Sequence, residues 1–162
     1  MVSLLDNQNA RSCIVSDIEL EPVSEEEKAL WPKDVLVPLD LSYKDARGEI
    51  IPLVDLPMKS AVWITSKAGT VRANHYHQTD WHFCYVVSGR IEYYYRPHGS
   101  TRPPERVVAK AGQQIFTPPM VEHAMVFPED TVFLTLGRNS RRQEVYEADV
   151  VRIEPIQPIQ KS

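Results

Sequence analysis

Four of the five histidines in this chain are concentrated in two short segments. His75 and His77 are two positions apart, so on a β-strand both side chains leave the same face. His82 follows a short turn-like sequence, and His123 belongs to the second segment. Imidazoles brought together from three strands are a typical set of metal ligands. The sequence therefore predicts a β-fold with a metal site formed by these four histidines.

The chain from Asp34 onward consists of short β-prone runs separated by the turn sequences Asp-Ala-Arg-Gly, Lys-Ala-Gly and Ser-Gly. Such spacing is typical of an antiparallel sandwich or jelly roll. No long helical period lies between the runs, which weighs against a parallel βαβ sheet. We therefore expect an all-β jelly roll. The predicted strands lie at residues 35–41, 50–54, 61–65, 83–87, 90–95 and 131–136.

A short helix is expected within a loop-rich N-terminal arm, at residues 24–31. Ser24 is a candidate N-cap, Glu27 could complete a capping box, and Pro32 would end the helix. A solvated charged face is the favoured interpretation of residues 25–27. The predicted divisions are an arm at residues 1–34, a jelly-roll domain at 35–155 and a C-terminal tail at 156–162.

Composition limits the possible partners. The 162-residue chain suits one domain, and its net charge of -4 argues against a nucleic-acid partner. No apolar run approaches the ~20 residues needed to span a bilayer, and no signal peptide is recognisable. Cys13 and Cys84 suggest no disulfide framework. These features predict a reduced, cytoplasmic protein without a membrane partner.

The first histidine segment resembles a sequence motif of the cupin superfamily. Gly69, His75, His77 and Gly89 match the glycine and histidine positions of that motif. His82 stands where the family has a glutamate. It could therefore bind a metal in place of the carboxylate or turn away as an outer group. The resemblance implies a cupin jelly-roll barrel with a metal held by histidines.

The second segment resembles the second cupin motif. Gly112, Pro118 and His123 match it, whereas Met120 replaces a glycine and Phe127 replaces an asparagine. Four neutral imidazoles would leave the full charge on a divalent metal and strengthen its action as a Lewis acid. Imidazole ligands suit Zn, Ni or Fe, so we expect one such ion as cofactor.

Strand alternation suggests further residues of the site. Tyr93 and Tyr95 share one face of a strand, where Tyr93 could act as a general acid and Tyr95 could bind ligand, or both could simply pack. Cys84 is expected to be a buried apolar residue or a ligand-binding thiol. Arg72 should face away from His75 in a regular strand. It is predicted either to bind an anionic ligand or to form a surface salt bridge.

A narrower resemblance suggests the activity. The Asp45-Ala-Arg-Gly48 turn, the Val71-Arg-x-x-His-x-His77 strand and the closing segment 138–149 are similar to small dTDP-sugar ketoisomerases and epimerases. In that branch, histidines of the paired strand act as acid or base on a 4-keto sugar, generally without metal. The resemblance therefore implies catalytic roles for His75 and His77.

The leading hypothesis is a sugar-nucleotide isomerase or epimerase, with metal dependence suggested by the histidine cluster. Two other functions remain open: a metal-dependent oxygenase or lyase acting on a small organic acid, and a non-catalytic metal- or ligand-binding protein. The substrate is expected to be a small molecule, with a nucleotide sugar favoured. Unpaired sheet edges and the long arm also predict a homodimer.

Overall fold

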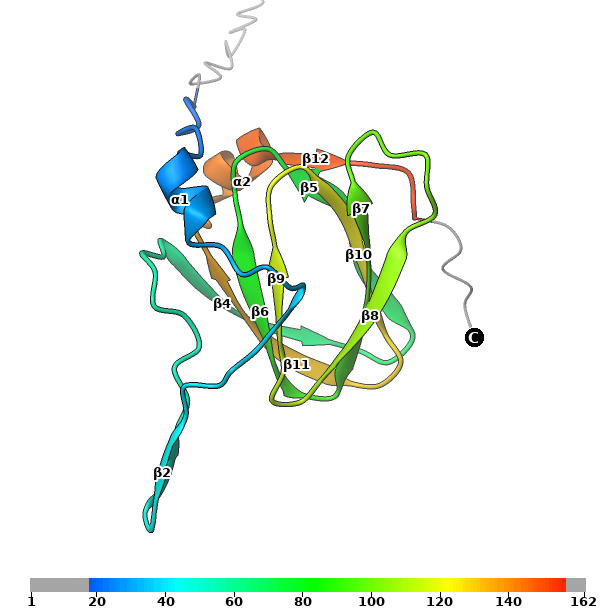
Figure 1. The fold of residues 1–162 in the computed structure, drawn as a ribbon. Coiled ribbons are helices and arrows are strands. Elements are labelled where there is room, and N and C mark those ends of the chain that lie inside the picture. Colours follow the sequence, from blue (N-terminus) through cyan, green and yellow to red (C-terminus); the bar gives the residue numbers. More distant parts are fainter. Residues whose placement is uncertain (1–17, 157–162) are drawn as a thin grey trace, which may run out of the picture.

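The computed structural model describes residues 18–156. Two five-stranded antiparallel sheets face each other across a common interior (Figure 1). The first contains, in order, β1 (Leu36–Val37), β9 (Gln114–Thr117), β6 (His82–Ser88), β11 (Thr131–Gly137) and β4 (Ser60–Ser66). The second contains β12 (Val150–Arg152), β5 (Thr70–His77), β10 (Val121–Phe127), β7 (Arg90–Pro97) and β8 (Glu105–Lys110). The predicted all-β jelly roll is confirmed.

The hydrophobic core lies between the two sheets and ends beneath the histidines. Val86 and Phe133 from the first sheet meet Ile91, Tyr93 and Phe127 from the second. All five side chains are almost completely buried. Because inward and outward positions alternate along each strand, the same strands carry this packed core and the polar residues above it.

The described part of the N-terminal arm, residues 18–34, packs on the outer face of the first sheet. Helix α1 (Glu25–Ala29) has both hydrogen bonds of the predicted capping box. After the helix, Trp31 packs against Trp81 and Phe116, with ring centroids 6.1 and 5.7 Å away. Within residues 18–156, no helix is both long and apolar enough to cross a bilayer.

Glu27 does not belong to a solvated charged face, which is the prediction for residues 25–27. Its carboxylate accepts a 2.6 Å hydrogen bond from Nε of Arg138, which is itself buried. A buried guanidinium needs a charged partner, and Glu27 supplies it across 111 positions of sequence. Glu25 does remain exposed, with Lys28 as its partner. The prediction is therefore wrong for Glu27.

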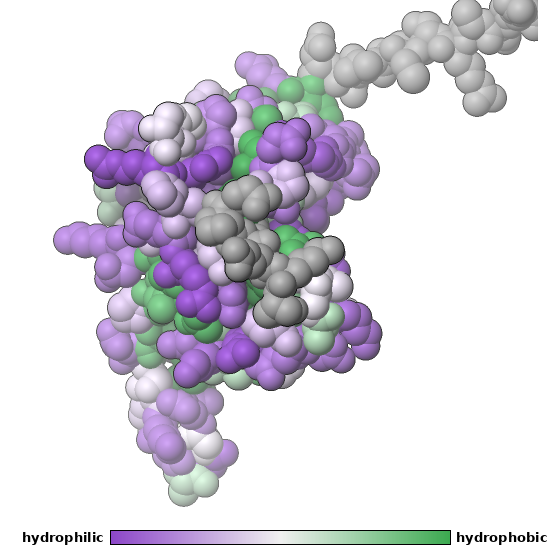
Figure 2. Space-filling model, turned by 90° about the vertical axis from the view of Figure 1, so that its right-hand side faces the viewer, coloured by the Kyte–Doolittle hydropathy of each residue, from purple (hydrophilic) through white to green (hydrophobic). Residues whose placement is uncertain are grey.

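A small hairpin stands away from the two sheets. It consists of β2 (Tyr43–Asp45) and β3 (Gly48–Ile50), and it projects at the lower edge of Figures 1 and 2. Its Asp-Ala-Arg-Gly turn is held by hydrogen bonds from Arg47 to Asp45. Tyr43 and Ile50 form a cross-strand pair whose side chains are largely exposed.

Gly89, in the tight turn between β6 and β7, should be the glycine that tolerates substitution least. Gly89 has φ +78°, and an added Cβ would lie 2.5 Å from the backbone oxygen of Asp130. Gly99 has φ +80° but no atom within 4 Å of an added Cβ. We expect Gly99→Ala to cost about 1–2 kcal/mol for its backbone conformation, and Gly89→Ala about 2–5 kcal/mol because the clash adds to that cost.

Thermal unfolding measures the difference. The melting temperature of Gly89→Ala should fall by about 5–15 °C, well beyond the fall for Gly99→Ala. Equal losses in the two variants would contradict the close approach between this turn and Asp130.

Candidate active site

Four histidine rings gather at one end of the space between the sheets. β5 places His75 and His77 on its inner face, and the pairing of β10 with β5 sets His123 opposite His75. His82 begins β6 in the facing sheet. The ring centroid of His75 lies 4.9 Å from that of His77 and 4.8 Å from that of His123. The ring of His82 lies 5.4 Å from His77 and 5.8 Å from His123.

Hydrogen bonds fix the orientation of two of these rings. Nδ1 of His77 lies 2.9 Å from a carboxylate oxygen of Asp149, and Nδ1 of His123 lies 2.9 Å from the carbonyl oxygen of Val121. Both partners are acceptors, so each Nδ1 carries the proton and each Nε2 keeps a free lone pair. A histidine tied in this way is pre-oriented to bind a metal or to accept a proton.

Burial keeps His75 and His123 neutral. Desolvation and the neighbouring histidines lower the pKa of His75 to about 3 and the pKa of His123 well below its usual value. Potential ligand atoms of His75, His77 and His123 all lie within 4.8 Å of one another. These three residues are therefore a suitable donor set for a divalent metal.

His82 differs from the other three histidines. Burial opposes its protonation, but Asp80 and Cys84 outweigh that effect and raise its pKa to about 10. Its Nδ1 lies 3.8 Å from the carboxylate of Asp80. Its potential ligand atoms form a group with those of His77 and Asp80 rather than with those of His75 and His123. This grouping leaves His82 outside the donor set formed by His75, His77 and His123.

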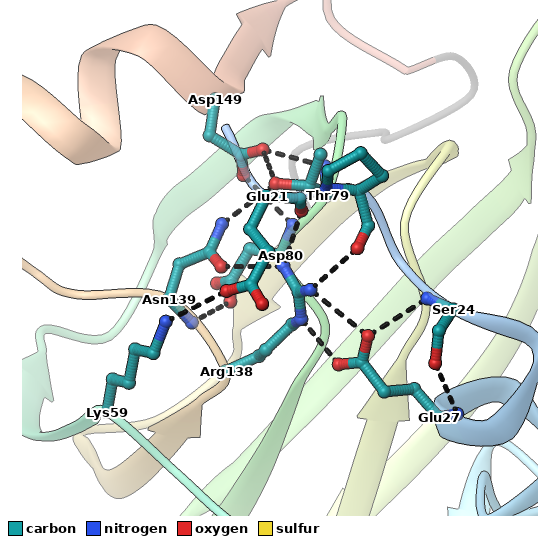
Figure 3. A network of polar contacts seen from close by, with 10 residues as sticks. Glu21, Ser24, Glu27, Lys59, Thr79, Asp80, Arg138, Asn139 and Asp149 are labelled. Carbon is teal, nitrogen blue, oxygen red and sulfur yellow. Dashed lines mark hydrogen bonds and ion pairs between the residues drawn. The ribbon is translucent and has the colours of Figure 1, made fainter. Parts of the chain in front are cut away.

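Asp149 is the most heavily bonded carboxylate of the site. It ends helix α2 (Gln143–Asp149) and accepts hydrogen bonds from the backbone nitrogen and the hydroxyl of Thr79, both at 2.7 Å. The backbone nitrogen of Asp80 donates at 3.2 Å (Figure 3). Burial alone would raise the pKa of Asp149, but His77 and Thr79 lower it below its ordinary range. Asp149 is thus held as a carboxylate behind His77.

Tyr146 extends from the same helix into the cavity and faces the paired histidines. Its ring centroid lies 5.7 Å from that of His77 and 6.4 Å from that of His75. The guanidinium of Arg141 lies 3.6 Å from the centre of the Tyr146 ring. Sequence reasoning did not single out Tyr146 or Asp149. The only signal for them was the resemblance of the closing segment 138–149.

Arg72 lines the cavity together with His75, contrary to the expectation that the two would face oppositely. β5 is not regular there, because Ala73 and Asn74 have positive φ values of 69° and 54°. The register with β10 shifts at the same point. This bulge changes the alternation of side chains and turns Arg72 inward. Its guanidinium donates to neutral oxygens, the hydroxyl of Ser66 and the carbonyl of Thr65.

The other predicted site residues occupy different places. Cys84 is buried, as expected, and it also lines the cavity, so ligand binding by its thiol stays a prediction. Tyr93 lies in the core, where its hydroxyl forms a 2.8 Å hydrogen bond with Thr117 and burial raises its pKa. Tyr95 bonds Glu105 at 3.0 Å. Packing, one of the two roles expected for Tyr93, therefore describes it: its ring centroid lies 5.7 Å from that of His123, whereas Tyr146 is the tyrosine that lines the cavity.

Comparison with known proteins identifies the fold. The family model described as a cupin domain matches residues 62–137. Residues 62–137 are a cupin domain. The match includes all four clustered histidines, whereas Tyr146 and Asp149 of α2 lie beyond the cupin domain. No curated protein sequence matches the chain at a significant level.

Several solved structures share the fold at low sequence identity. The 3,4-ketoisomerase QdtA from Thermoanaerobacterium thermosaccharolyticum, in complex with TDP, has a TM-score of 0.57 and 17% identity over 69% of this chain and 82% of its own. The epimerase RmlC from Legionella pneumophila, in complex with dTDP-4-keto-L-rhamnose, has a TM-score of 0.57 and 17% identity, covering 72% and 71%. CapF from Staphylococcus aureus, a capsular polysaccharide assembling protein, has a TM-score of 0.54 and 19% identity, covering 71% and 32%.

Proposed function

We propose that this protein is an isomerase or epimerase that moves a proton next to the ketone of a nucleotide-linked sugar. The observation that carries the proposal is the 2.9 Å contact between His77 and the buried carboxylate of Asp149, with Tyr146 facing the same imidazole. A base oriented by a carboxylate, with a second proton carrier opposite, is the arrangement that such a reaction needs.

Each side chain then has a defined part in the reaction. Asp149 holds the proton of His77 on Nδ1, so Nε2 can accept a proton from the carbon beside the ketone. The electron pair of the broken C–H bond moves to the ketone oxygen, and the Tyr146 hydroxyl can protonate that oxygen. In the resulting enediol, loss of the proton from the hydroxyl of the deprotonated carbon and return of a proton to the former ketone carbon give a ketoisomer. Loss of the proton from the newly formed hydroxyl and return of a proton to the opposite face of the deprotonated carbon give an epimer.

The cavity also has the charge to hold an anionic substrate. Arg72 donates to neutral oxygens, and Arg141 stacks on the ring of Tyr146. None of these neutral partners offsets the positive charge of a guanidinium group, so a phosphate or carboxylate can bind to both at the cavity. The complexes of QdtA with TDP and of RmlC with dTDP-4-keto-L-rhamnose support a nucleotide sugar as the ligand class.

A divalent transition metal is proposed as the cofactor, with Zn, Ni and Fe as the candidates. The residues fit such an ion because His75, His77 and His123 offer three nitrogen donors, two of them with Nδ1 tied to an acceptor. A metal bound there would polarise a ketone and acidify the adjacent C–H. Asp149 would then orient a ligand rather than a base, and the proton transfer would fall to Tyr146.

Solvent-deuterium exchange tests the proposed reaction. Purified protein incubated in D₂O with a panel of 4-keto-6-deoxy sugar nucleotides should introduce deuterium next to the ketone. Exchange reports proton removal whether the product is an isomer or an epimer. No exchange across the panel, together with oxygen uptake on a small organic acid, would identify an oxygenase instead.

Removal of the metal assigns the role of His77. If exchange survives treatment with a chelator, His77 is the base, because its Nε2 cannot bind a metal and a proton at once. If exchange is lost and returns with added metal, His77 is a ligand and Tyr146 carries the proton. Metal analysis of each sample provides the necessary control.

A homodimer is the proposed assembly. The β2–β3 hairpin stands off the sheets with Ile50 66% exposed, and the edge strand β4 carries Trp63 at 62% exposure. An isolated two-stranded hairpin is marginally stable in water, and an open sheet edge favours pairing with another chain.

We expect the protein to sediment at twice the 18.5 kDa chain mass. Ile50→Ser should weaken the dimer, whereas Lys44→Ser on the opposite hairpin face should not. Sedimentation as a monomer at micromolar concentration would contradict the proposed homodimer.

A further inference from the structure

A continuous series of hydrogen bonds connects the N-terminal arm to Asp149 (Figure 3), and Asp149 in turn contacts His77. It starts where the carboxylate of Glu27 binds the guanidinium of Arg138, and it continues from Arg138 to the side-chain oxygen of Asn139 at 3.1 Å. The Asn139 amide then donates to the Thr79 hydroxyl at 2.9 Å. Thr79 in turn donates to Asp149, the partner of His77.

Arg138 is the fixed point of this series. It is 5% exposed, and its guanidinium has five N–H donors. Two of them bind the carboxylate of Glu27, one reaches the carbonyl of Glu21, one reaches the carbonyl of Pro22 and one reaches Asn139. Every donor therefore has an acceptor, and four of the five acceptors lie in the arm. Arg138 thus links Asn139 directly to the arm.

The hydroxyl of Thr79 transmits this order to the carboxylate. Because Asn139 donates to it, its own proton is left free to point at Oδ1 of Asp149, 2.7 Å away. The backbone nitrogen of Asn139 also binds Asp80 at 2.8 Å, which fixes the loop that contains Thr79. The orientation of the carboxylate, and hence of the His77 ring, follows from these contacts.

We propose that Thr79, Asn139 and Arg138 are positioning residues, through which the docked arm holds the Asp149–His77 pair in its working geometry. The inference rests on the proposed function for its catalytic meaning, but the geometry of His77 can be measured without a substrate. It makes the arm part of the active site rather than an appendage of the cupin domain.

The test compares variants that break or keep single bonds of the series. Thr79→Val removes the hydroxyl and keeps the shape, and Asn139→Ala removes the amide. Thr79→Ser retains the hydroxyl as the conservative control. Glu27→Gln keeps a capping-box residue but removes the charge facing Arg138, whereas Glu25→Gln alters an exposed carboxylate of the same helix.

The first measurement is the NMR signal of the His77 Nδ1 proton and its rate of exchange with solvent. We expect this rate to rise at least about tenfold in Thr79→Val and Asn139→Ala and at least about threefold in Glu27→Gln, because each change loosens the carboxylate that protects the proton. The rates in Thr79→Ser and Glu25→Gln should stay within about twofold of the unsubstituted protein.

The second measurement is deuterium incorporation into the substrate. The maximal rate should fall at least about tenfold in Thr79→Val and Asn139→Ala. KM should stay nearly unchanged in Thr79→Val, because Thr79 orients the base without lining the cavity, whereas Asn139 lines it and its variant is compared by the maximal rate alone. An unsubstituted protein that exchanges no deuterium would reject the proposed function alone. Unchanged proton exchange in folded Thr79→Val and Asn139→Ala would overturn the positioning role, and unchanged exchange in Glu27→Gln alone would overturn the part assigned to the arm.

Discussion

Replacing Asp149 with asparagine is expected to lower deuterium exchange by about 10²–10⁴-fold. One carboxylate oxygen of Asp149 accepts two bonds from Thr79, and the other faces His77 and accepts only the 3.2 Å bond from the backbone nitrogen of Asp80. The amide NH₂ of the variant therefore takes the position facing His77, at the loss of one backbone bond. There it donates to Nδ1 and forces the proton of His77 onto Nε2. An imidazole in that tautomer can neither accept a proton nor bind a metal at the cavity.

A neighbouring substitution controls for the change of charge. Glu147 lies on the same helix and pairs with Arg152 on the exposed surface. Glu147→Gln should leave deuterium exchange within about twofold of the unsubstituted rate, because surface pairs contribute little. A folded Asp149→Asn protein that retains the full rate would remove the His77–Asp149 pair from the mechanism.

Loss of metal from the three-histidine set is the second large effect that we expect. Protein purified without an affinity metal should contain about one divalent ion per chain. His75→Ala, His77→Ala and His123→Ala each remove a donor from the set and should weaken binding by more than about 100-fold. Elemental analysis and competition with a chelator measure both quantities.

His82→Ala separates the two roles considered for that residue. Because the potential ligand atoms of His82 do not group with those of His75 and His123, this variant should keep near-normal metal content. Loss of metal equal to that in His123→Ala would make His82 a ligand. Less than half an equivalent in the unsubstituted protein, even after Zn or Fe is added, would reject the metal site.

The sequence predicted the elements whose side chains follow regular alternation. His75, His77 and Cys84 point into the interior as their strand positions require, and the two motifs bring His123 beside them. The prediction failed for Arg72, since two residues with positive φ interrupt β5 between it and His75. Asn74 belongs to a residue type that tolerates positive φ, but alanine does not favour it and one asparagine does not fix the position of a bulge, so regular alternation predicted the opposite face.

Tyr146 and Asp149 were missed for a different reason. They reach the site from a helix that follows the last long strand, and Asp149 is 72 positions from the histidine it holds. Contacts of that range leave no local periodicity. The ion pair of Glu27 with Arg138 was missed on the same ground, because a run of acidic residues at a helix start is consistent with solvent exposure as well as with a buried partner.

The division between the cupin domain and the segments around it has a consequence for how such proteins diverge. The sheets supply the imidazoles. The candidate proton carrier Tyr146 and the carboxylate of Asp149 come instead from helix α2, which follows the cupin domain in the chain. An insertion or exchange in that helix could change the reaction while the barrel stays intact. Relatives with the same histidines but a different closing helix should therefore be grouped by that helix when their activities are compared.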